Sequence, residues 1–317
     1  MNSFIPTNPK LFFSKDDKRD LRLGDLATPV SDIPKDSYCL LGYPDHEGIN
    51  LNGGRVGAAE APAKIREYLY KMTPPKGVLP ENFKIADCGD LNPDLGLIAA
   101  RHTKVLNFAG RLQAEANRIL SFGGGHDYGY PDAAAFVQTQ LALGLRPVVI
   151  NFDAHLDVRP TDKGLNSGTP FFRLLNEFKS QFDFFEIGLQ PQCNSPFHAE
   201  WAESMGASLH WLDDVRRAGG PASLLKELLG PRLELKTPVF VSFDIDSLNS
   251  AQAPGCSQSW ATGLELSETI EALRLLKKST DLKAMGIYEV SPPLDICNIT
   301  AKSAAILAYN FLFGEGL

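Results

Sequence analysis

The feature that most constrains this fold is a regular alternation between short apolar runs and longer segments with helical spacing. The apolar runs have the length and the side-chain types of strands. They lie at Tyr38–Tyr43, Ile119–Phe122, Pro147–Phe152, Phe182–Leu189, Ser208–Leu212, Pro238–Phe243 and Ala284–Val290. The helical segments are Ala61–Tyr70, His102–Asn117, Pro131–Leu143, Pro221–Leu229, Ser267–Lys277 and Ala301–Phe311. This alternation predicts an α/β fold in which helices cover both faces of a mostly parallel sheet.

The chain of 317 residues shows no internal division. No repeat, low-complexity tract or linker rich in proline and glycine separates two halves, and a chain of this length can bury one large α/β core. The first residues are polar and lie ahead of the alternating segments. We therefore predict a single domain over residues 31–317, preceded by an N-terminal arm over residues 1–30.

Composition limits the class of partner. The net charge of -7 argues against a nucleic-acid or anionic-membrane partner. The N-terminus has no apolar signal-peptide core, and no segment approaches the roughly 20 apolar residues of a membrane span. The five cysteines have no CxxC spacing, which favours free thiols in a reducing compartment over disulfides or a metal site. We expect a cytoplasmic protein that acts on a small molecule.

Three of the predicted strands run directly into charged sequence, where ligands of an open α/β sheet collect. The three strand ends read Gly123-Gly124-Gly125-His126-Asp127, Asp153-Ala154-His155-Leu156-Asp157 and Asp244-Ile245-Asp246. In an extended chain, residues i and i+2 point to the same side. Asp153, His155 and, if the chain stays extended, Asp157 would therefore face one way. Asp244 and Asp246 would do the same.

Each of these segments also has a simpler interpretation. A histidine after glycines is often a capping or packed residue, and Asp-x-Asp is often a turn or a helix cap. The glycines could cradle a phosphate, although no GxGxxG or GxxxxGK[ST] pattern is present. Taken together, however, four carboxylates at adjacent strand ends would repel one another unless cations neutralise them. Carboxylates with two imidazoles suit ions such as Mn²⁺, and two divalent cations balance four carboxylates. We therefore predict a two-metal site.

At these residues the sequence resembles the ureohydrolase family, which comprises arginases, agmatinases, formimidoylglutamases and their relatives. GGGHD, DAHLD and SFDID are similar to its three metal-binding signatures. Residues 52–58, with Pro62 and Ile65-Arg66, are similar to its opening GR-GA…P…IR pattern, and residues 87–90 resemble its second-strand D-x-G-D. The resemblance runs from about residue 38 to residue 313, which is nearly the whole chain.

The resemblance implies an arginase-like three-layer α/β/α fold, two Mn²⁺ ions per subunit and, as is common in the family, a homo-oligomer. Carried over by position, one ion would be held by His126, Asp153, Asp157 and Asp244. The other would be held by Asp153, His155, Asp244 and Asp246, so that Asp153 and Asp244 bridge the pair. A water shared by two cations ionises near neutral pH. It would then attack the carbon of an amidino or formimino group.

Two acids are implied to take part in the chemistry. Asp157 would carry a proton from the nucleophile to the leaving nitrogen. Glu289 would pair with the cationic C–N group of the substrate and direct its carbon toward the nucleophile. The alternative for Glu289 is a surface or helix-capping acid, but its position at the end of an apolar strand favours the site.

The substrate depends on residues outside the metal ligands. Arginases are expected to have a histidine in a GNxHG motif downstream of DAHLD, and agmatinases an HGT, whereas Ser167 stands here before Gly168-Thr169. The R-P…NSGTPF pattern and the later G-L-Q…NS segment resemble formimidoylglutamase, whose substrate is N-formimidoyl-L-glutamate. A dicarboxylate needs several donors, and we assign this role to Arg159, Asn166, Gln190 and Asn194. The alternative for Arg159 is a structural salt bridge with an acid such as Asp162.

One departure from the family pattern follows the third metal motif. Asn249-Ser250 stands where many relatives have Asp-Pro. All the proposed metal ligands precede this change, but it can reshape the loop. Two other functions stay open. The protein could hydrolyse another guanidino or amidino compound with the same metals, or it could be a catalytically silent homologue that serves as a metal-binding or scaffold protein.

Overall fold

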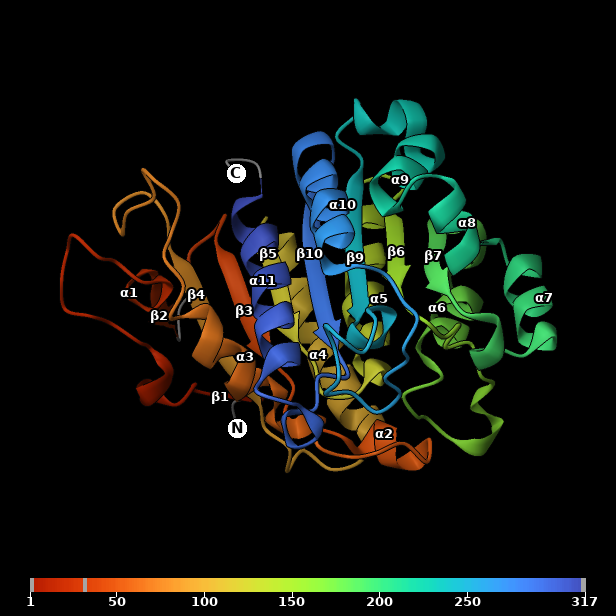
Figure 1. Cartoon of the computed structure of the whole chain (residues 1–317), viewed down its shortest axis with the longest axis horizontal. Coiled ribbons are helices and arrows are strands. Elements are labelled where there is room, and N and C mark those ends of the chain that lie inside the picture. Colours follow the sequence, from red (N-terminus) through yellow and green to blue (C-terminus); the bar gives the residue numbers. More distant parts are fainter. Residues whose placement is uncertain (1–2, 31–32, 315–317) are drawn as a thin grey trace.

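The computed structural model describes residues 3–30 and 33–314, and these form a ten-stranded sheet (Figure 1). The strands are β1 (Phe4–Ile5), β2 (Ala27–Pro29), β3 (Tyr38–Gly42), β4 (Ile85–Leu91), β5 (Arg118–Phe122), β6 (Val148–Phe152), β7 (Asp183–Leu189), β8 (Ala207–Trp211), β9 (Pro238–Asp244) and β10 (Asp281–Tyr288). Their order is β1-β4-β3-β5-β10-β9-β6-β7-β8, and β2 also pairs with β4. The β1–β4 pair is antiparallel and the other pairs are parallel, so the predicted mostly parallel sheet is confirmed.

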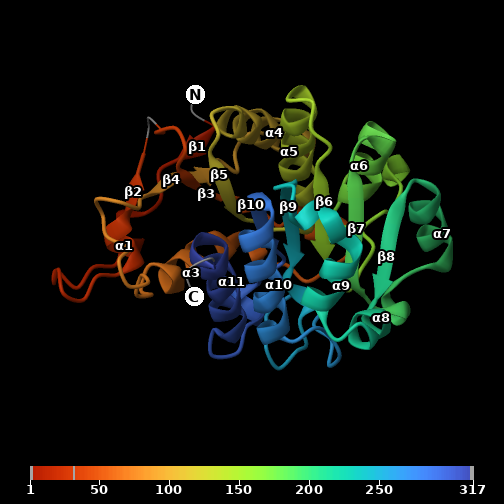
Figure 2. The same ribbon diagram turned by 90° about the horizontal axis from the view of Figure 1, so that it is seen from above.

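Helices cover both faces of the sheet, as the sequence predicted. Figure 2 shows α4, α5 and α6 on one face, and α3, α11, α10 and α9 on the other. The helices are α1 (Leu23–Leu26), α2 (Glu47–Leu51), α3 (Ala61–Leu69), α4 (Ile98–Ala114), α5 (Gly129–Ala142), α6 (Pro170–Phe178), α7 (Pro196–Ser204), α8 (Leu212–Arg217), α9 (Pro221–Leu229), α10 (Leu266–Ser279) and α11 (Ile299–Phe313). Two hydrophobic clusters fill the space between the sheet and the two helix layers. This is the predicted three-layer arrangement.

The predicted strands and helices are all present, with some shifted boundaries. The largest shift is in α4, which the periodicity placed at His102–Asn117 and which the structure places at Ile98–Ala114. The helix ends early because Ala116 has a left-handed backbone with φ of 63°. The last predicted strand starts earlier, at Asp281, and ends at Tyr288 because Glu289 has φ of 64°. Leu212, expected to end a strand, begins α8 instead.

The strand β4 does not stand out by periodicity because it carries two acids. Both acids are held by Arg66 of α3, whose side chain is fully buried. Its Nε lies 3.0 Å from Asp87 Oδ2, and its Nη1 lies 2.7 Å from Asp90 Oδ1. Buried charges of this kind are tolerated only when they are paired, and this pairing fixes α3 on the sheet.

The residues predicted to form an N-terminal arm contribute to the sheet edge. Phe4–Ile5 and Ala27–Pro29 both pair with β4, and the hydroxyl of Thr7 donates to Asp87 Oδ1 at 2.8 Å. Residues 31–32, where the arm would meet the domain, lie outside the described residues. The division at residue 30 therefore stays a prediction.

Two further features concern the chain as a whole. The five cysteines are free, as expected from their spacing. Within residues 3–30 and 33–314, none of the helices has the length and apolar character needed to cross a bilayer.

Candidate metal centre

The register of the sheet brings the three charged strand ends together. Phe122 of β5 pairs with Ile287 of β10, Ile287 with Phe243 of β9, and Phe243 with Phe152 of β6. These four strands therefore end at the same level. The residues that follow them emerge at one edge of the sheet, which is where an open α/β sheet binds ligands.

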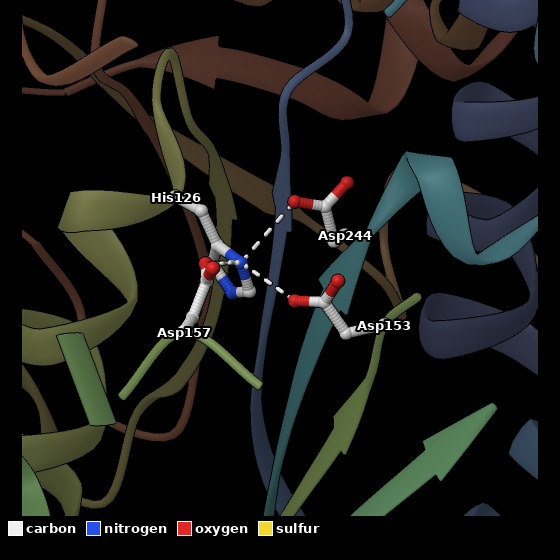
Figure 3. A group of neighbouring side chains, drawn as sticks. All are labelled: His126, Asp153, Asp157 and Asp244. Atoms are coloured by element: carbon white, nitrogen blue, oxygen red, sulfur yellow. Dashed lines mark ion pairs between the residues drawn. The ribbon is translucent and has the colours of Figure 1, made fainter. Parts of the chain in front are cut away.

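The first ligand group lies around the imidazole of His126. Figure 3 shows three carboxylates pointing toward this ring, from Asp153, Asp157 and Asp244. Their Oδ2 atoms lie 3.0, 2.9 and 3.2 Å from His126 Nδ1, respectively. Ligands about 2.1 Å from an octahedral ion are about 3.0 Å from their neighbours in the shell. The spacing of these atoms therefore fits a single metal ion.

The second ligand group shares Asp153 with the first. Asp153 Oδ1 lies 3.5 Å from His155 Nδ1, which is 3.0 Å from Asp246 Oδ2. Asp153, His155 and Asp246 form a second set able to hold an ion. The two oxygens of Asp153 thus face the two imidazoles separately, as a bridging carboxylate requires. Asp244 belongs to the first group alone, so its predicted role as a second bridge stays a prediction. We call the six predicted ligands the metal floor.

The imidazole of His126 is oriented for a metal. Its Nδ1 is buried and has no hydrogen-bond partner, while its Nε2 lies 2.8 Å from the hydroxyl of Ser242. The ring of Tyr288 stacks against it with centroids 4.9 Å apart. An unpartnered buried nitrogen is costly. A cation bound between this nitrogen and the three carboxylates would remove that cost, so the donor set fits a metal.

The backbone at the metal floor is folded tightly. A Cβ on Gly124 would lie 1.5 Å from the carbonyl oxygen of Asp45, so this position requires glycine. The extended chain that would align Asp157 with Asp153 ends at Phe152, and Asp157 itself has φ of 49°. Asp157 therefore reaches His126 through a turn. Left-handed non-glycine residues are strained and gather at functional sites.

Glu289 lies at the metal floor, as predicted from its position after the last strand. It is 6% exposed, and its Oε1 accepts a hydrogen bond from the backbone N–H of His126 at 3.0 Å. Its own N–H donates to the carbonyl of Gly124 at 2.9 Å. Burial raises the pKa of Glu289 to about 8, the bond from His126 opposes this, and the charge of Asp246 adds to it. This arrangement disfavours the alternative of a surface acid.

Burial and mutual repulsion both oppose ionisation of the acids of the metal floor. Burial, followed by the charges of Asp246 and Asp153, raises the pKa of Asp244 well above its usual range. Burial also opposes ionisation of Asp153, but the adjacent imidazoles of His126 and His155 outweigh it and hold the pKa of Asp153 below its usual range. Such a cluster binds protons in the absence of cations, and metal ions would displace those protons.

A cavity of about 580 Å³ opens above the metal floor. Arg159, Asn52 and Ser167 line it together, and we call these three residues the rim group. Arg159 Nη1 donates to Asn52 Oδ1, and Asn52 Nδ2 donates to Ser167 Oγ at 3.0 Å. Arg159 is exposed, and the ion pairs of the described residues do not include one between Arg159 and Asp162. Its guanidinium has further N–H groups available for a ligand.

The three amides predicted to bind substrate differ in position. Asn194 lines the cavity, but its side chain bonds to the backbone of Leu156, Ala154 and Gln190. The Gln190 amide is buried against Thr262, and Asn166 Oδ1 accepts from the N–H of Gly168. Neither Gln190 nor Asn166 lines the cavity. Their roles as substrate contacts stay predictions, and the structure assigns all three amides a part in holding loops.

Several residues of the site were not singled out from the sequence. Asn52 was noted only within a family pattern, and Ser167 only as a replacement for histidine. Ser242 lies two residues before the metal ligand Asp244, and Tyr288 lies one residue before Glu289. Residues two apart on a strand share a face, so the prediction that Asp244 lies at the site could also have indicated Ser242. The contact between Asn52 and Ser167 joins residues 115 positions apart and has no local signal.

The Asn249-Ser250 departure lies in a loop that is closed by its own hydrogen bonds. Asn249 Nδ2 donates to Glu265 Oε1 at 3.0 Å, and the N–H of Ser250 donates to the carbonyl of Trp260 at 2.7 Å. Neither residue lines the cavity, whereas Trp260 does. The departure thus leaves the metal floor intact and helps to place the loop that forms one cavity wall.

Comparisons with known proteins agree with this geometry. The sequence model of the arginase family matches residues 37–314. The formimidoylglutamase of Paraburkholderia xenovorans is 29% identical over 328 residues, covering 97% of this chain and 99% of that protein. The structure of Trypanosoma cruzi formiminoglutamase with Mn²⁺ is 30% identical, with a TM-score of 0.80 over 93% of this chain and 98% of that one. The Bacillus subtilis formimidoylglutamase structure is 28% identical, with a TM-score of 0.84 over 95% and 94% of the two chains.

These matches confirm the resemblance drawn from the three metal motifs and the predicted fold. They extend over both helix layers and all the strand ends that form the metal floor. The predicted enzyme class, a hydrolase acting on carbon–nitrogen bonds in linear amidines, is confirmed as well. The chain belongs to the arginase family.

Proposed function

We propose that this protein is a formimidoylglutamase with two Mn²⁺ ions, which converts N-formimidoyl-L-glutamate and water to L-glutamate and formamide. The relatives of that name support the reaction, and the T. cruzi structure with Mn²⁺ supports the metal. The two ligand groups that share Asp153 support a pair of ions.

The observation that carries the substrate is the distribution of charge around the cavity. Among the described residues that line it, Arg159 is the sole lysine or arginine, and the carboxylates belong to the metal floor or to Glu289. N-Formimidoyl-L-glutamate has two carboxylates and no free ammonium. Agmatine has a remote ammonium and arginine has an ammonium beside a carboxylate, and both would need an acceptor on the rim. The cavity therefore suits an anionic substrate best.

The rim group would bind a substrate carboxylate. Arg159 can donate two parallel hydrogen bonds to a carboxylate, and its bond to Asn52 restricts the guanidinium. Ser167 accepts from Asn52 at 3.0 Å, so its hydroxyl hydrogen stays free to donate to the ligand.

The residues at the metal floor would carry the chemistry. Two ions held by the six residues of the metal floor would supply a water nucleophile near neutral pH. Glu289, held by the backbone of His126, pairs with the protonated formimino group and aims its carbon at the nucleophile. Asp157 accepts the proton of the nucleophile and delivers it to the glutamate nitrogen. The carbon–nitrogen bond then breaks, which releases glutamate and formamide.

The test is a steady-state assay of the Mn²⁺-loaded protein with N-formimidoyl-L-glutamate, arginine and agmatine. We expect formamide from the first substrate and no appreciable urea from the other two. Urea release alone would instead assign a guanidino hydrolase. No turnover of any substrate by a protein that binds no Mn²⁺ would leave the silent homologue as the better account. A cytoplasmic location and a homo-oligomer stay predictions.

A further inference from the structure

A sixth carboxylate, Glu186, is buried beside the metal floor and has no part in the mechanism above. Glu186 lies in β7 and is 0% exposed. The parallel register places it beside Asn151 of β6, which pairs in turn with Ser242 of β9. Asn151 and Ser242 each precede a metal ligand by two residues. This row of polar residues therefore lies directly behind the metal floor.

The side chain of Asn151 connects Glu186 to the shared ligand. Its Nδ2 donates to Glu186 Oε2 at 2.8 Å and to Asp153 Oδ2 at 3.2 Å. A primary amide has two N–H hydrogens, so these two bonds use both. Asp153 Oδ2 is the oxygen that faces His126, whereas Oδ1 faces His155. Asn151 thus holds the oxygen of Asp153 that would bind the first ion.

Glu186 differs from the other deeply buried acids in its lack of partners. Asp132 accepts hydrogen bonds from Tyr43, Tyr288 and Ser121, and Asp87 pairs with Arg66. In the described part of the chain, the side chain of Glu186 bonds to Asn151 alone, and its Oε1 has no partner. A buried acid with one partner costs stability, and an apolar residue would fill this position at lower cost.

We infer that Glu186 is a positioning residue: it orients Asn151, which in turn holds Asp153 as a carboxylate able to bridge two ions. This inference rests on the two-ion centre of the proposed function. Residues that orient metal ligands in this indirect way typically change metal affinity by about 10–100-fold when they are substituted.

The experiment compares Mn²⁺ binding by the wild type, Glu186→Met and Glu186→Gln, with electron paramagnetic resonance to count free Mn²⁺ and detect coupled pairs. Glu186→Met removes the acceptor for Asn151 and keeps the volume. We expect its Mn²⁺ affinity to fall by about 10–100-fold and its coupled-pair signal to weaken. Glu186→Gln keeps an oxygen that can accept from Asn151, so it should bind close to the wild-type level. Phe185→Leu, on the opposite face of β7, is the control and should bind normally.

The melting temperature without metal separates positioning from a structural role. Because Glu186→Met removes a buried acid, the metal-free variant should melt no lower than the metal-free wild type. Wild-type Mn²⁺ affinity in Glu186→Met would overturn the inference, as would an equal loss of affinity in the glutamine variant.

Asn151→Ala extends the test and serves by itself if Glu186→Met does not fold. It should show the same loss of affinity, and the double variant should lose no more than either single variant, because both act on one contact. Normal affinity in Asn151→Ala, or additive losses, would contradict the inference. Wild-type protein that fails to bind two ions would contradict the proposed function itself, whereas wild-type binding with unaffected variants would contradict the inference alone.

Discussion

The metal floor and the rim group line one cavity but are built in different ways. The floor is supplied by strand ends whose register fixes them at one level, and His126, Asp153, Asp244 and Asp246 are at most 4% exposed. The rim group comes from loops, and Arg159 at its centre is exposed. A sheet edge holds charged ligands rigidly, while loops can vary without disturbing it. We therefore propose that the floor determines the reaction and the rim group determines the substrate.

The largest expected effect comes from substituting Asp153, the metal ligand that the two groups of the floor share. Asp153→Asn keeps the shape of the side chain but removes the charge that would balance both ions. We expect loss of bound Mn²⁺ and a fall in kcat on the order of 10⁴-fold or more, as when a residue of a catalytic unit is removed. Metal analysis and formamide release measure the two effects. Asp162→Asn, an exposed acid on the neighbouring loop, is the control and should keep both.

The next effect isolates the rim. Arg159→Ala should raise KM for N-formimidoyl-L-glutamate by about 10–100-fold, since a charge-assisted hydrogen bond contributes about 1.5–3 kcal/mol. Bound Mn²⁺ should not change. Lys163→Ala removes an exposed cation of the same loop that does not line the cavity, and its KM should stay normal. Loss of metal in the arginine variant would show that floor and rim are not separate.

How much of this was predictable from the sequence differs between the two regions. The three motifs of the floor follow strands with clear apolar runs, which predicted that they meet at one edge of the sheet. The family resemblance then divided the six ligands between two ions. The turn at Asp157 was not predictable, because the sequence gives no local sign of its left-handed backbone.

On the rim, Arg159 could be predicted from its position two residues beyond Asp157. Its partner Asn52 could not, because the two meet only through tertiary folding, 107 residues apart. Gln190 and Asn166 have the donors that a carboxylate ligand needs. The fold directs those amides into loops instead. The residue type shows which hydrogen bonds a side chain can form, and the fold decides which of them it does form.

A third prediction concerns pH and the charge of the floor. The pKa of Glu289 is raised from 4.5 to about 8. Its ionisation therefore lowers the free energy of unfolding by the full amount above pH 8, and this loss is absent below pH 4.5. The pKa values of His126 and His155 are also raised, so their contributions act in the same direction, being present at low pH and lost as pH rises. Metal-free protein should therefore melt at a higher temperature at pH 5 than at pH 8.

Bound Mn²⁺ should reverse this trend, because protons and metal ions compete for the same acids. The increase in melting temperature caused by saturating Mn²⁺ should shrink as pH falls from 8 to 5. Glu289→Gln should flatten the upper part of the metal-free profile. A Mn²⁺ effect that does not depend on pH would show that the acids of the floor do not bind the ions.

The smallest expected effect distinguishes loop support from substrate contact. Gln190→Leu removes buried hydrogen bonds to Thr262 and should destabilise the fold by about 1–3 kcal/mol without a change in KM. Thermal unfolding and steady-state kinetics on the same samples measure both. A rise in KM with normal stability would restore the predicted role of Gln190 as a substrate contact.

The most direct test of the whole account counts Mn²⁺ per chain during reconstitution and follows formamide release from N-formimidoyl-L-glutamate in the same samples. The account predicts two ions per chain at saturation, with release rising as the second ion binds. Full turnover with one ion or none, or two bound ions without formamide release, would contradict it.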